Sequence, residues 1–306
     1  MEISKVSAEL QSAVRKLPPM PLASWWGRRL IQALLGMVPA AHVEGVKLRR
    51  VDDAGAGLRI HVPDVRRSAG ALLWIHGGGF LIGRPKQDDL FCAMTAKLVD
   101  IPVIAAGYRL APRFPFPAAL DDCYTAWLWL QENAASLGVD PHSVIIGDQS
   151  AGGALAASLV QRVCDAGGIG AKAQWLFCPA LDDRTAARRE LDGLEHFVWA
   201  NRNNAFGWRS YVSTEPGTPI IPPYAAAARR EDMHGLPAAW IGVGEIDLFH
   251  DEDLDYARRL READVAVTMV TVPGAPHGFE AWAPKTEIAC NFISGARQWL
   301  METVQG

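Results

Sequence analysis

Short apolar runs bounded by glycine or proline recur along the chain, and each has the length of a strand. Segments with the apolar spacing of a helix lie between them. The runs that predict strands are 71–75, 103–107, 144–146, 175–177, 239–243 and 267–272. The segments that predict helices are 88–99, 118–133, 151–165, 254–262 and 286–304. This alternation predicts an α/β fold with a mostly parallel central sheet flanked by helices, because parallel neighbours need a crossover that is usually helical.

Other segments do not follow the alternation. The runs 47–51 and 58–62 predict an antiparallel pair of strands ahead of the sheet. Segments of about 1–43 and about 184–213 are expected to form a small helical cap on a single domain of residues 1–306. The cap segments carry Trp25, Trp26, Trp199 and Trp208. A thin helical layer would bury these side chains, either in packing against the main domain or as the wall of a ligand pocket.

Composition excludes several classes of protein. The 306 residues are 49% hydrophobic, enough for a large core. With 30 Lys and Arg against 34 Asp and Glu, no positive field favours nucleic acid. The five cysteines are scattered without a Cys-x-x-Cys pair, which fits a reduced, cytoplasmic setting. No apolar run approaches the ~18 residues of a spanning helix, and charges interrupt residues 1–16, so we expect no stable membrane insertion and no signal peptide.

Three consecutive glycines follow the strand predicted over 71–75. Gly77, Gly78 and Gly79 come directly after His76. Backbone N–H groups without side chains around them can approach a developing oxyanion closely. A phosphate-binding loop is the alternative, but the glycine and lysine spacings of such loops are absent. His76 is interpreted as structural support for this loop, because a general base belongs on a loop that can reach the nucleophile.

A serine stands where another strand meets an alanine-rich helix. Ser150 follows the strand that begins at 144 and precedes Ala151, Gly152 and Gly153. A serine at such a turn is exposed at the helix N-terminus, and small residues after it let the helix pack closely. An ordinary helix N-cap is the alternative. The combination with the glycine loop favours a nucleophile.

A serine nucleophile needs a general base and a carboxylate that orients the base. Asp247 and His277 each follow one of the last two predicted strands, so both are expected at the same edge of the sheet as Ser150. Glu245 is the rival acid. No two histidines have metal-ligand spacing on one helix, so no metal site is expected.

With these motifs the sequence resembles the hormone-sensitive-lipase-like carboxylesterases, the bacterial family IV of the α/β-hydrolases, whose members carry a helical cap. The resemblance covers about residues 71–277. The segments that carry it are His76–Gly79, Tyr108–Pro112, Pro115–Asp122, Ser150–Gly153, Asp247–Phe249 and His277–Phe279.

The resemblance implies an α/β-hydrolase fold and a role for each residue of the site. Ser150 is then the nucleophile, His277 the general base and Asp247 its orienting acid. The oxyanion is then held by the backbone N–H groups of Gly78, Gly79 and Ala151. Gly77 is a less favoured donor and, with His76, supports the loop.

One position departs from the family pattern. The family usually has glycine two residues before the serine, and this chain has Asp148. Either the turn accepts a β-carbon there, or Gln149 acts as an insertion and the loop is remodelled. A carboxylate that faced the oxyanion site would oppose the transition state.

The resemblance further implies hydrolysis of short- to medium-chain acyl esters through an acyl-enzyme, with a small-molecule ester as substrate and no cofactor. Family members often form dimers, so a homodimer is a further expectation. Amides, lactones and acetylated metabolites remain alternative substrates of the same triad. A non-catalytic ligand-binding protein is the alternative of a different class, and the presence of Ser150, Asp247 and His277 argues against it.

Overall fold

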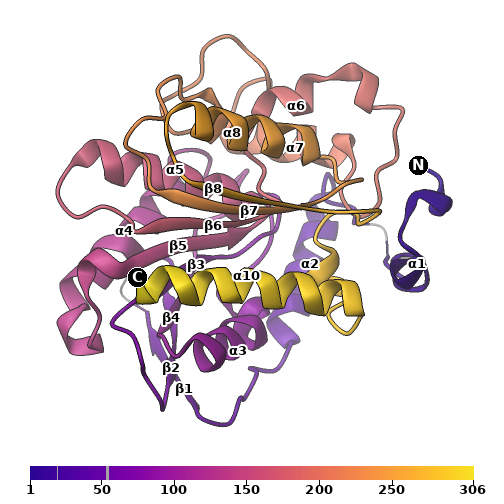
Figure 1. Cartoon of the computed structure of the whole chain (residues 1–306). Helices are drawn as coiled ribbons and strands as arrows, with labels where there is room; N and C mark the ends of the chain where they lie inside the picture. Colours follow the sequence, from indigo (N-terminus) through magenta and orange to yellow (C-terminus); the bar gives the residue numbers. More distant parts are fainter. Residues whose placement is uncertain (19, 53–54) are drawn as a thin grey trace.

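An eight-stranded sheet runs through the molecule, as the computed structural model of residues 1–18, 20–52 and 55–306 shows (Figure 1). The strands stand in the order β1-β2-β4-β3-β5-β6-β7-β8. Their bounds are β1 Val46–Val51, β2 Leu58–Pro63, β3 Ala71–Ile75, β4 Val103–Ala106, β5 Val144–Gln149, β6 Ala173–Phe177, β7 Ala238–Gly244 and β8 Val267–Val272. β2 pairs antiparallel with β1 and β4, and every other neighbouring pair is parallel. The predicted fold class is therefore confirmed.

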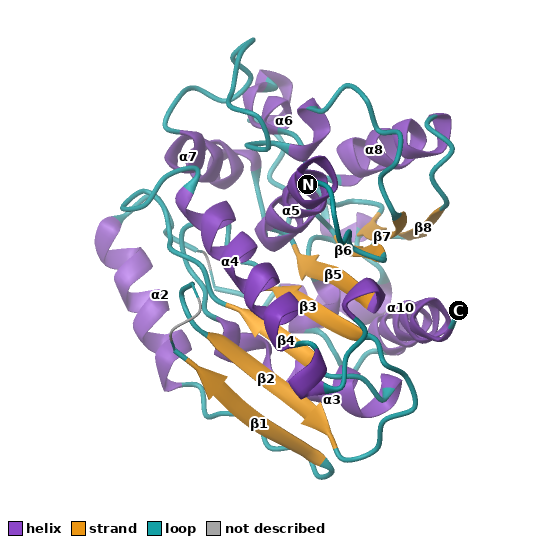
Figure 2. Cartoon of the chain, turned by 90° about the vertical axis from the view of Figure 1, so that its left-hand side faces the viewer, coloured by secondary structure: helices purple, strands orange, loops and turns teal. Residues whose placement is uncertain are grey.

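Helices cover both faces of this sheet (Figures 1 and 2). One face carries α3 (Asp89–Val99) and α10 (Glu287–Gln305), and the other carries α4 (Ala118–Asn133), α5 (Ala151–Ala166) and α8 (His250–Glu262). No helix within the described residues is both long and apolar enough to cross a membrane.

Strand β3 explains why the sequence shows unbroken apolar runs. Leu73 and Ile75 belong to the core under α4, α5 and α8, whereas Leu72 and Trp74 belong to the core under α3 and α10. Successive side chains of a strand point to opposite faces, so a strand that is covered on both faces is apolar at every position. The carboxyl end of this strand delivers the glycine loop.

Among the described residues, four α-helices fall within about one residue of the two segments expected to form the cap: α1 (Ala8–Val14), α2 (Trp25–Met37), α6 (Asp183–Ala187) and α7 (Asn201–Val212). Trp199 and Trp208 are buried as expected. The expectation is wrong for Trp25 and Trp26, which are each 63% exposed. Only Gly27 of α2 is buried, and the helix is held instead by polar bonds, in which the side chain of Gln32 donates to and accepts from the backbone of Gly83 at 2.8 Å.

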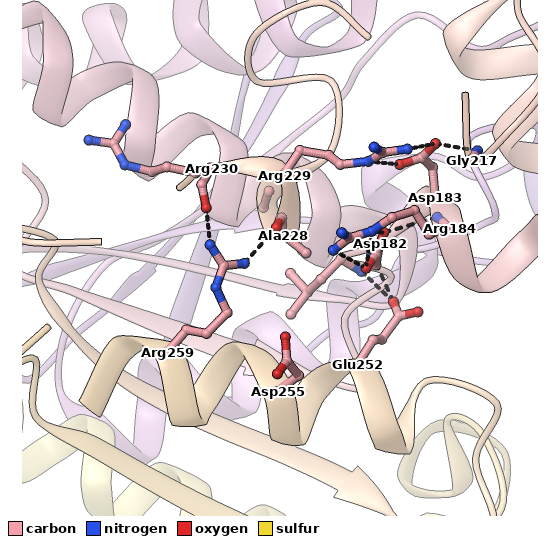
Figure 3. A network of polar contacts seen from close by, with 12 residues as sticks. Asp182, Asp183, Arg184, Gly217, Ala228, Arg229, Arg230, Glu252, Asp255 and Arg259 are labelled. Atoms are coloured by element: carbon pink, nitrogen blue, oxygen red, sulfur yellow. Dashed lines mark hydrogen bonds and ion pairs between the residues drawn. The ribbon is translucent and has the colours of Figure 1, made fainter. Parts of the chain in front are cut away.

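Helix α8 begins at His250, four residues earlier than predicted, so three acidic residues occupy its first turn. Glu252 among them is buried and accepts hydrogen bonds from the backbone N–H groups of Leu181 and Asp182, at 2.6 and 3.1 Å (Figure 3). Nearby, the fully buried Asp183 pairs with Arg229 at 2.7 Å. This network fixes the start of α8 against the segment after β6, and therefore also the loop between β7 and α8.

Candidate active site

Ser150 lies at the turn between β5 and α5 with φ 59° and ψ −119°, a strained conformation for a residue other than glycine. Its N–H donates to the carbonyl oxygen of Phe177 at 2.9 Å. The turn needs small residues after the serine, because a β-carbon on Gly152 would lie 2.3 Å from the carbonyl oxygen of Ile75. The strand and the close-packed helix therefore present Ser150 at the carboxyl edge of the sheet.

Two hydrogen bonds connect Ser150, His277 and Asp247. The Oγ of Ser150 lies 2.8 Å from Nε2 of His277, and Nδ1 of His277 lies 2.8 Å from Oδ2 of Asp247. The other carboxylate oxygen of Asp247 accepts from the backbone N–H of Phe249 at 3.0 Å, which fixes its orientation. Glu245, the rival acid, is exposed and bonds instead to a backbone N–H of the loop that precedes His277. The structure thus brings together the three residues that the sequence singled out.

The surroundings of His277 favour proton uptake. Burial lowers the pKa of His277, but the charge and hydrogen bond of Asp247 and the charge of Glu280 outweigh burial and raise it above 6.5. Since Asp247 occupies Nδ1, the nitrogen that faces Ser150 is free to accept a proton. This arrangement suits a general base.

The glycine loop passes beside Ser150 and tolerates no side chains. Gly78 has φ 133° and Gly79 has φ 60°. A β-carbon on Gly78 would lie 2.0 Å from the carbonyl oxygen of Ile82, and one on Gly79 would lie 2.3 Å from the ring of Trp199. The N–H groups of Gly78, Gly79 and Ala151 bond to no acceptor in the described part of the chain. They are available to a substrate oxygen.

His76 is placed as structural support of the loop. It is buried, and its Nδ1 lies 2.8 Å from the carbonyl oxygen of Gly77. Its ring stacks on Tyr108 with centroids 4.2 Å apart, and the Tyr108 hydroxyl donates to the His76 carbonyl oxygen at 3.0 Å. Burial lowers the pKa of His76 to about 4, so its ring is neutral at pH 7.

The strand continues without interruption through Asp148, which pairs in register with Ile75 on one side and Leu176 on the other. The turn therefore accepts a β-carbon at this position, and no insertion remodels the loop. Room for the carboxyl group comes from Gly153, where a β-carbon would lie 2.3 Å from Oδ2 of Asp148.

The Asp148 carboxyl is fully buried, and neither oxygen has a hydrogen-bond partner in the described residues. Burial raises its pKa well above the usual range, and the charge of Glu280 adds to the shift. Asp148 does not line the pocket in front of Ser150. Burial thus favours the protonated form of this acid beneath the first turn of α5, and that form does not oppose an oxyanion.

The pocket in front of Ser150, called the serine pocket below, has a volume of about 190 Å³. Trp199 forms one wall, with its ring centroid 6.2 Å from that of His277. Trp199 is therefore a wall of the pocket. Trp208 instead packs inside the protein, with its ring centroid 5.1 Å from that of Phe80. Gln149 and Gly278, which adjoin Ser150 and His277 in the sequence, also line the pocket. Sequence reasoning did not find the following further lining residues: Met20, Ile82, Gln87, Val198, Ala281 and Trp282.

Among the residues that were not found, Trp282 has a signal in the sequence, because it follows His277 by five residues. In the structure its indole N–H donates to the His277 carbonyl oxygen at 2.9 Å. Met20 and Val198 come from the cap segments, and nothing in the sequence ties these segments to the serine.

One group of potential metal ligands lies together within the described ranges: Cys178, Asp247 and His277. Two of its members already bond to each other. Burial raises the pKa of the Cys178 thiol well above its usual value, and Glu280 adds to the shift, so the thiol keeps its proton. A protonated thiol is a poor metal ligand.

Comparison with known proteins identifies the family. Residues 72–281 match the family described as having the α/β-hydrolase fold. The chain belongs to the hormone-sensitive-lipase-like α/β-hydrolases. Carboxylic ester hydrolase LipN of Mycobacterium tuberculosis is 34% identical to this hydrolase over 263 aligned positions, and the alignment covers 82% of this chain and 68% of LipN. Ethyl acetate hydrolase of Pseudomonas putida is 32% identical over 218 residues, 71% of this chain and 68% of the relative.

The fold of the hydrolase is also that of solved esterases. A bacterial heroin esterase superimposes with a TM-score of 0.92 at 32% identity, over 99% of each chain. Membership in this family places the protein among the carboxylic ester hydrolases.

Proposed function

We propose that the hydrolase is a serine carboxylesterase that cleaves short- to medium-chain acyl esters through an acyl-enzyme intermediate. The observation that carries this proposal is the pair of 2.8 Å hydrogen bonds from Ser150 through His277 to Asp247. A serine, an imidazole and a carboxylate in this order are the parts of an activated nucleophile.

The first step forms the acyl-enzyme. The Oγ of Ser150 attacks the acyl carbonyl carbon while its proton passes to Nε2 of His277. The N–H groups of Gly78, Gly79 and Ala151 donate to the resulting oxyanion. His277 then gives its proton to the leaving alcohol, and the acyl group stays on Ser150 as an ester.

The second step releases the acid. His277 takes a proton from water, and the oxygen of that water attacks the acyl carbon. The carbon–Oγ bond breaks, and the proton returns from His277 to Ser150. Asp247 accepts the hydrogen bond from Nδ1 of His277 and stabilises the imidazolium that forms in each step.

The size of the serine pocket supports small acyl groups. Its volume of about 190 Å³ is below the ~300 Å³ at the lower end of typical ligand pockets. One relative is named for ethyl acetate, whose acyl group has two carbons. Amides and lactones remain second candidates because the same groups would attack them. No observation in the described residues favours them over esters.

Hydrolysis of a series of p-nitrophenyl acyl esters tests the proposal. The wild type is expected to turn over the short esters, and Ser150→Ala is expected to lose about 10⁴-fold or more in kcat. Ser158→Ala is the matched control, because Ser158 is a buried serine on α5 that lies outside the hydrogen-bonded relay. Equal activity of wild type and Ser150→Ala, or a folded wild type with no activity, would refute the proposal.

A further inference from the structure

A second cavity lies directly behind the serine pocket, on the face of the sheet covered by α3 and α10. We call it the rear cavity. Its volume is about 320 Å³. Its apolar walls are formed by Trp74, Leu90, Phe91, Met94, Phe177 and Ile293. None of the proposed catalytic steps uses it.

The two cavities share a wall of three residues, Gln87, Gln149 and Ala281. Gln87 is held by the backbone of the glycine loop, because its side-chain nitrogen donates to the carbonyl oxygen of Gly77 at 3.4 Å. Gln149 reaches across the wall, and its Nε2 donates to Oε1 of Glu280 at 2.6 Å. The partition therefore consists of two flexible glutamine side chains and one methyl group.

The position of Gln149 follows from the strand that carries it. Asp148 points toward α5, so the next residue of β5 points to the opposite face, where the rear cavity lies. Gln149 also directly precedes Ser150. An acyl chain that extends from the carbonyl carbon on Ser150 toward this side therefore meets the Gln149–Glu280 hydrogen bond before it reaches the apolar walls of the rear cavity.

Another cavity adjoins the serine pocket where the cap segments contribute to its lining. It has a volume of about 760 Å³, shares Met20 and Val198 with the serine pocket, and has polar lining residues that include Glu195 and Arg202. This wider, more polar space suits a leaving alcohol on its way to solvent, whereas the rear cavity suits a hydrocarbon chain.

The polar groups of the rear cavity do not oppose such a chain. Asp88 is bonded to the indole N–H of Trp74 at 2.9 Å, and burial raises the pKa of Asp88 to about 7. Arg297 of α10 is directed to α3, because its Nε donates to Oγ1 of Thr95 and its guanidinium lies over the ring of Phe91.

We propose that the rear cavity binds the distal part of the substrate's acyl chain, and that the Gln149–Glu280 hydrogen bond is the gate that limits acyl length. The proposal rests on the proposed esterase function and adds the hydrocarbon acyl chain as the ligand of this cavity. Short acyl groups fit the serine pocket with the gate closed. Longer ones enter only when Gln149 moves away from Glu280.

The test compares kcat/KM for p-nitrophenyl hexanoate with kcat/KM for p-nitrophenyl acetate within each variant. Each methylene moved from water into apolar surroundings strengthens binding by roughly fourfold. If the last two methylenes of the hexanoyl chain enter the rear cavity, the expected gain is about fifteenfold. Gln149→Ala is expected to raise the hexanoate-to-acetate ratio by about that factor. Gln298→Ala is the matched control, because Gln298 makes the same kind of bond to Glu302, at 2.7 Å, on the exposed face of α10. Its ratio is expected to stay at the wild-type value.

A second variant fills the rear cavity far from Ser150. Met94→Trp adds volume to the wall from α3, and it is expected to lower the hexanoate-to-acetate ratio both alone and in the Gln149→Ala background. If Gln149→Ala does not fold, Met94→Trp alone decides: a lowered ratio supports the proposal, and an unchanged ratio overturns it.

Substrates with a constant acetyl group and alcohols of increasing length distinguish the acyl from the alcohol side. A Gln149→Ala effect on this alcohol series instead of the acyl series overturns the proposal, and so does a hexanoate-to-acetate ratio within twofold of wild type. A wild type that cleaves acetate leaves the proposed function intact in either case. A wild type that cleaves no ester overturns both proposals.

Discussion

Replacing Asp148 by asparagine tests the claim that this buried carboxyl is a neutral acid. Asparagine has almost the same shape, so the change removes the ability to ionise and leaves the packing against Gly153 in place. The carboxyl is fully buried without a hydrogen-bond partner in the described residues, and burial raises its pKa well above 3.8. In the unfolded chain the same group ionises near pH 4.

The sign and size of the effect follow from this difference in pKa. Between the unfolded and the folded pKa, the folded protein holds one more proton than the unfolded chain. Wild-type stability therefore falls as pH rises through this range, by about 1.4 kcal/mol per pH unit from this site. The asparagine side chain has no such proton to lose, so the stability advantage of Asp148→Asn is expected to be near zero at pH 4. It should then grow by about 1.4 kcal/mol per unit until the pH reaches the folded pKa.

Urea unfolding of both proteins at pH 4, 5, 6 and 7 measures this difference, because contributions from all other titrating groups are shared. Asp165→Asn serves as the control without such a slope. The hydrogen bond from Arg230 lowers the pKa of Asp165, so this group is ionised in both states above about pH 5, and its stability difference from wild type should stay nearly constant from pH 5 to 7. The reasoning is refuted if the stability difference between Asp148→Asn and wild type does not change with pH. It is also refuted if Asp148→Asn becomes the less stable protein as pH rises, because that result requires a stabilised carboxylate in the folded state.

Three further predictions concern the site. The kcat/KM for a short ester should fall as pH decreases through the pKa of His277, because only the neutral ring accepts a proton. The midpoint of this fall should lie above pH 6.5, and a midpoint below pH 6.5 would contradict the raised pKa. Gly79→Ala should lower kcat by about 10²-fold or more, because the β-carbon of the alanine meets the ring of Trp199 and displaces the N–H of residue 79 from the oxyanion. The circular dichroism spectrum should stay unchanged, and a wild-type rate would exclude Gly79 as an oxyanion donor. Tyr108→Phe should reduce unfolding free energy in urea by about 1 kcal/mol through loss of the bond to the His76 carbonyl, and equal stability would contradict a structural role for that bond.

Much of the fold could be predicted because the sheet is covered on both faces. In β3 this produces a run of apolar residues with a clear beginning and end, and the structure places that strand at the predicted residues. Ser150, Asp247 and His277 could be found for a related reason. Each follows a strand, and the carboxyl ends of parallel strands meet at one edge of the sheet.

Features that depend on contacts between distant segments could not be predicted. The exposure of Trp25 follows from polar bonds between α2 and the loop after the glycines, which leave no mark in the apolar pattern of α2. The tolerance for Asp148 depends on its contact with Gly153 across the turn. The Gln149–Glu280 bond joins residues 131 positions apart, and neither residue belongs to a family motif that the sequence displayed.

The alternation of side chains along β3 also divides the molecule into two parts that respond separately to change. Leu72 and Leu73 are neighbours in the chain, yet one packs under α3 and α10 and the other under α4, α5 and α8. Substitutions without shared partners add in their effect on stability. The layer that contains the rear cavity can therefore be redesigned for new acyl groups while the opposite layer, which holds the turn at Ser150, keeps its packing.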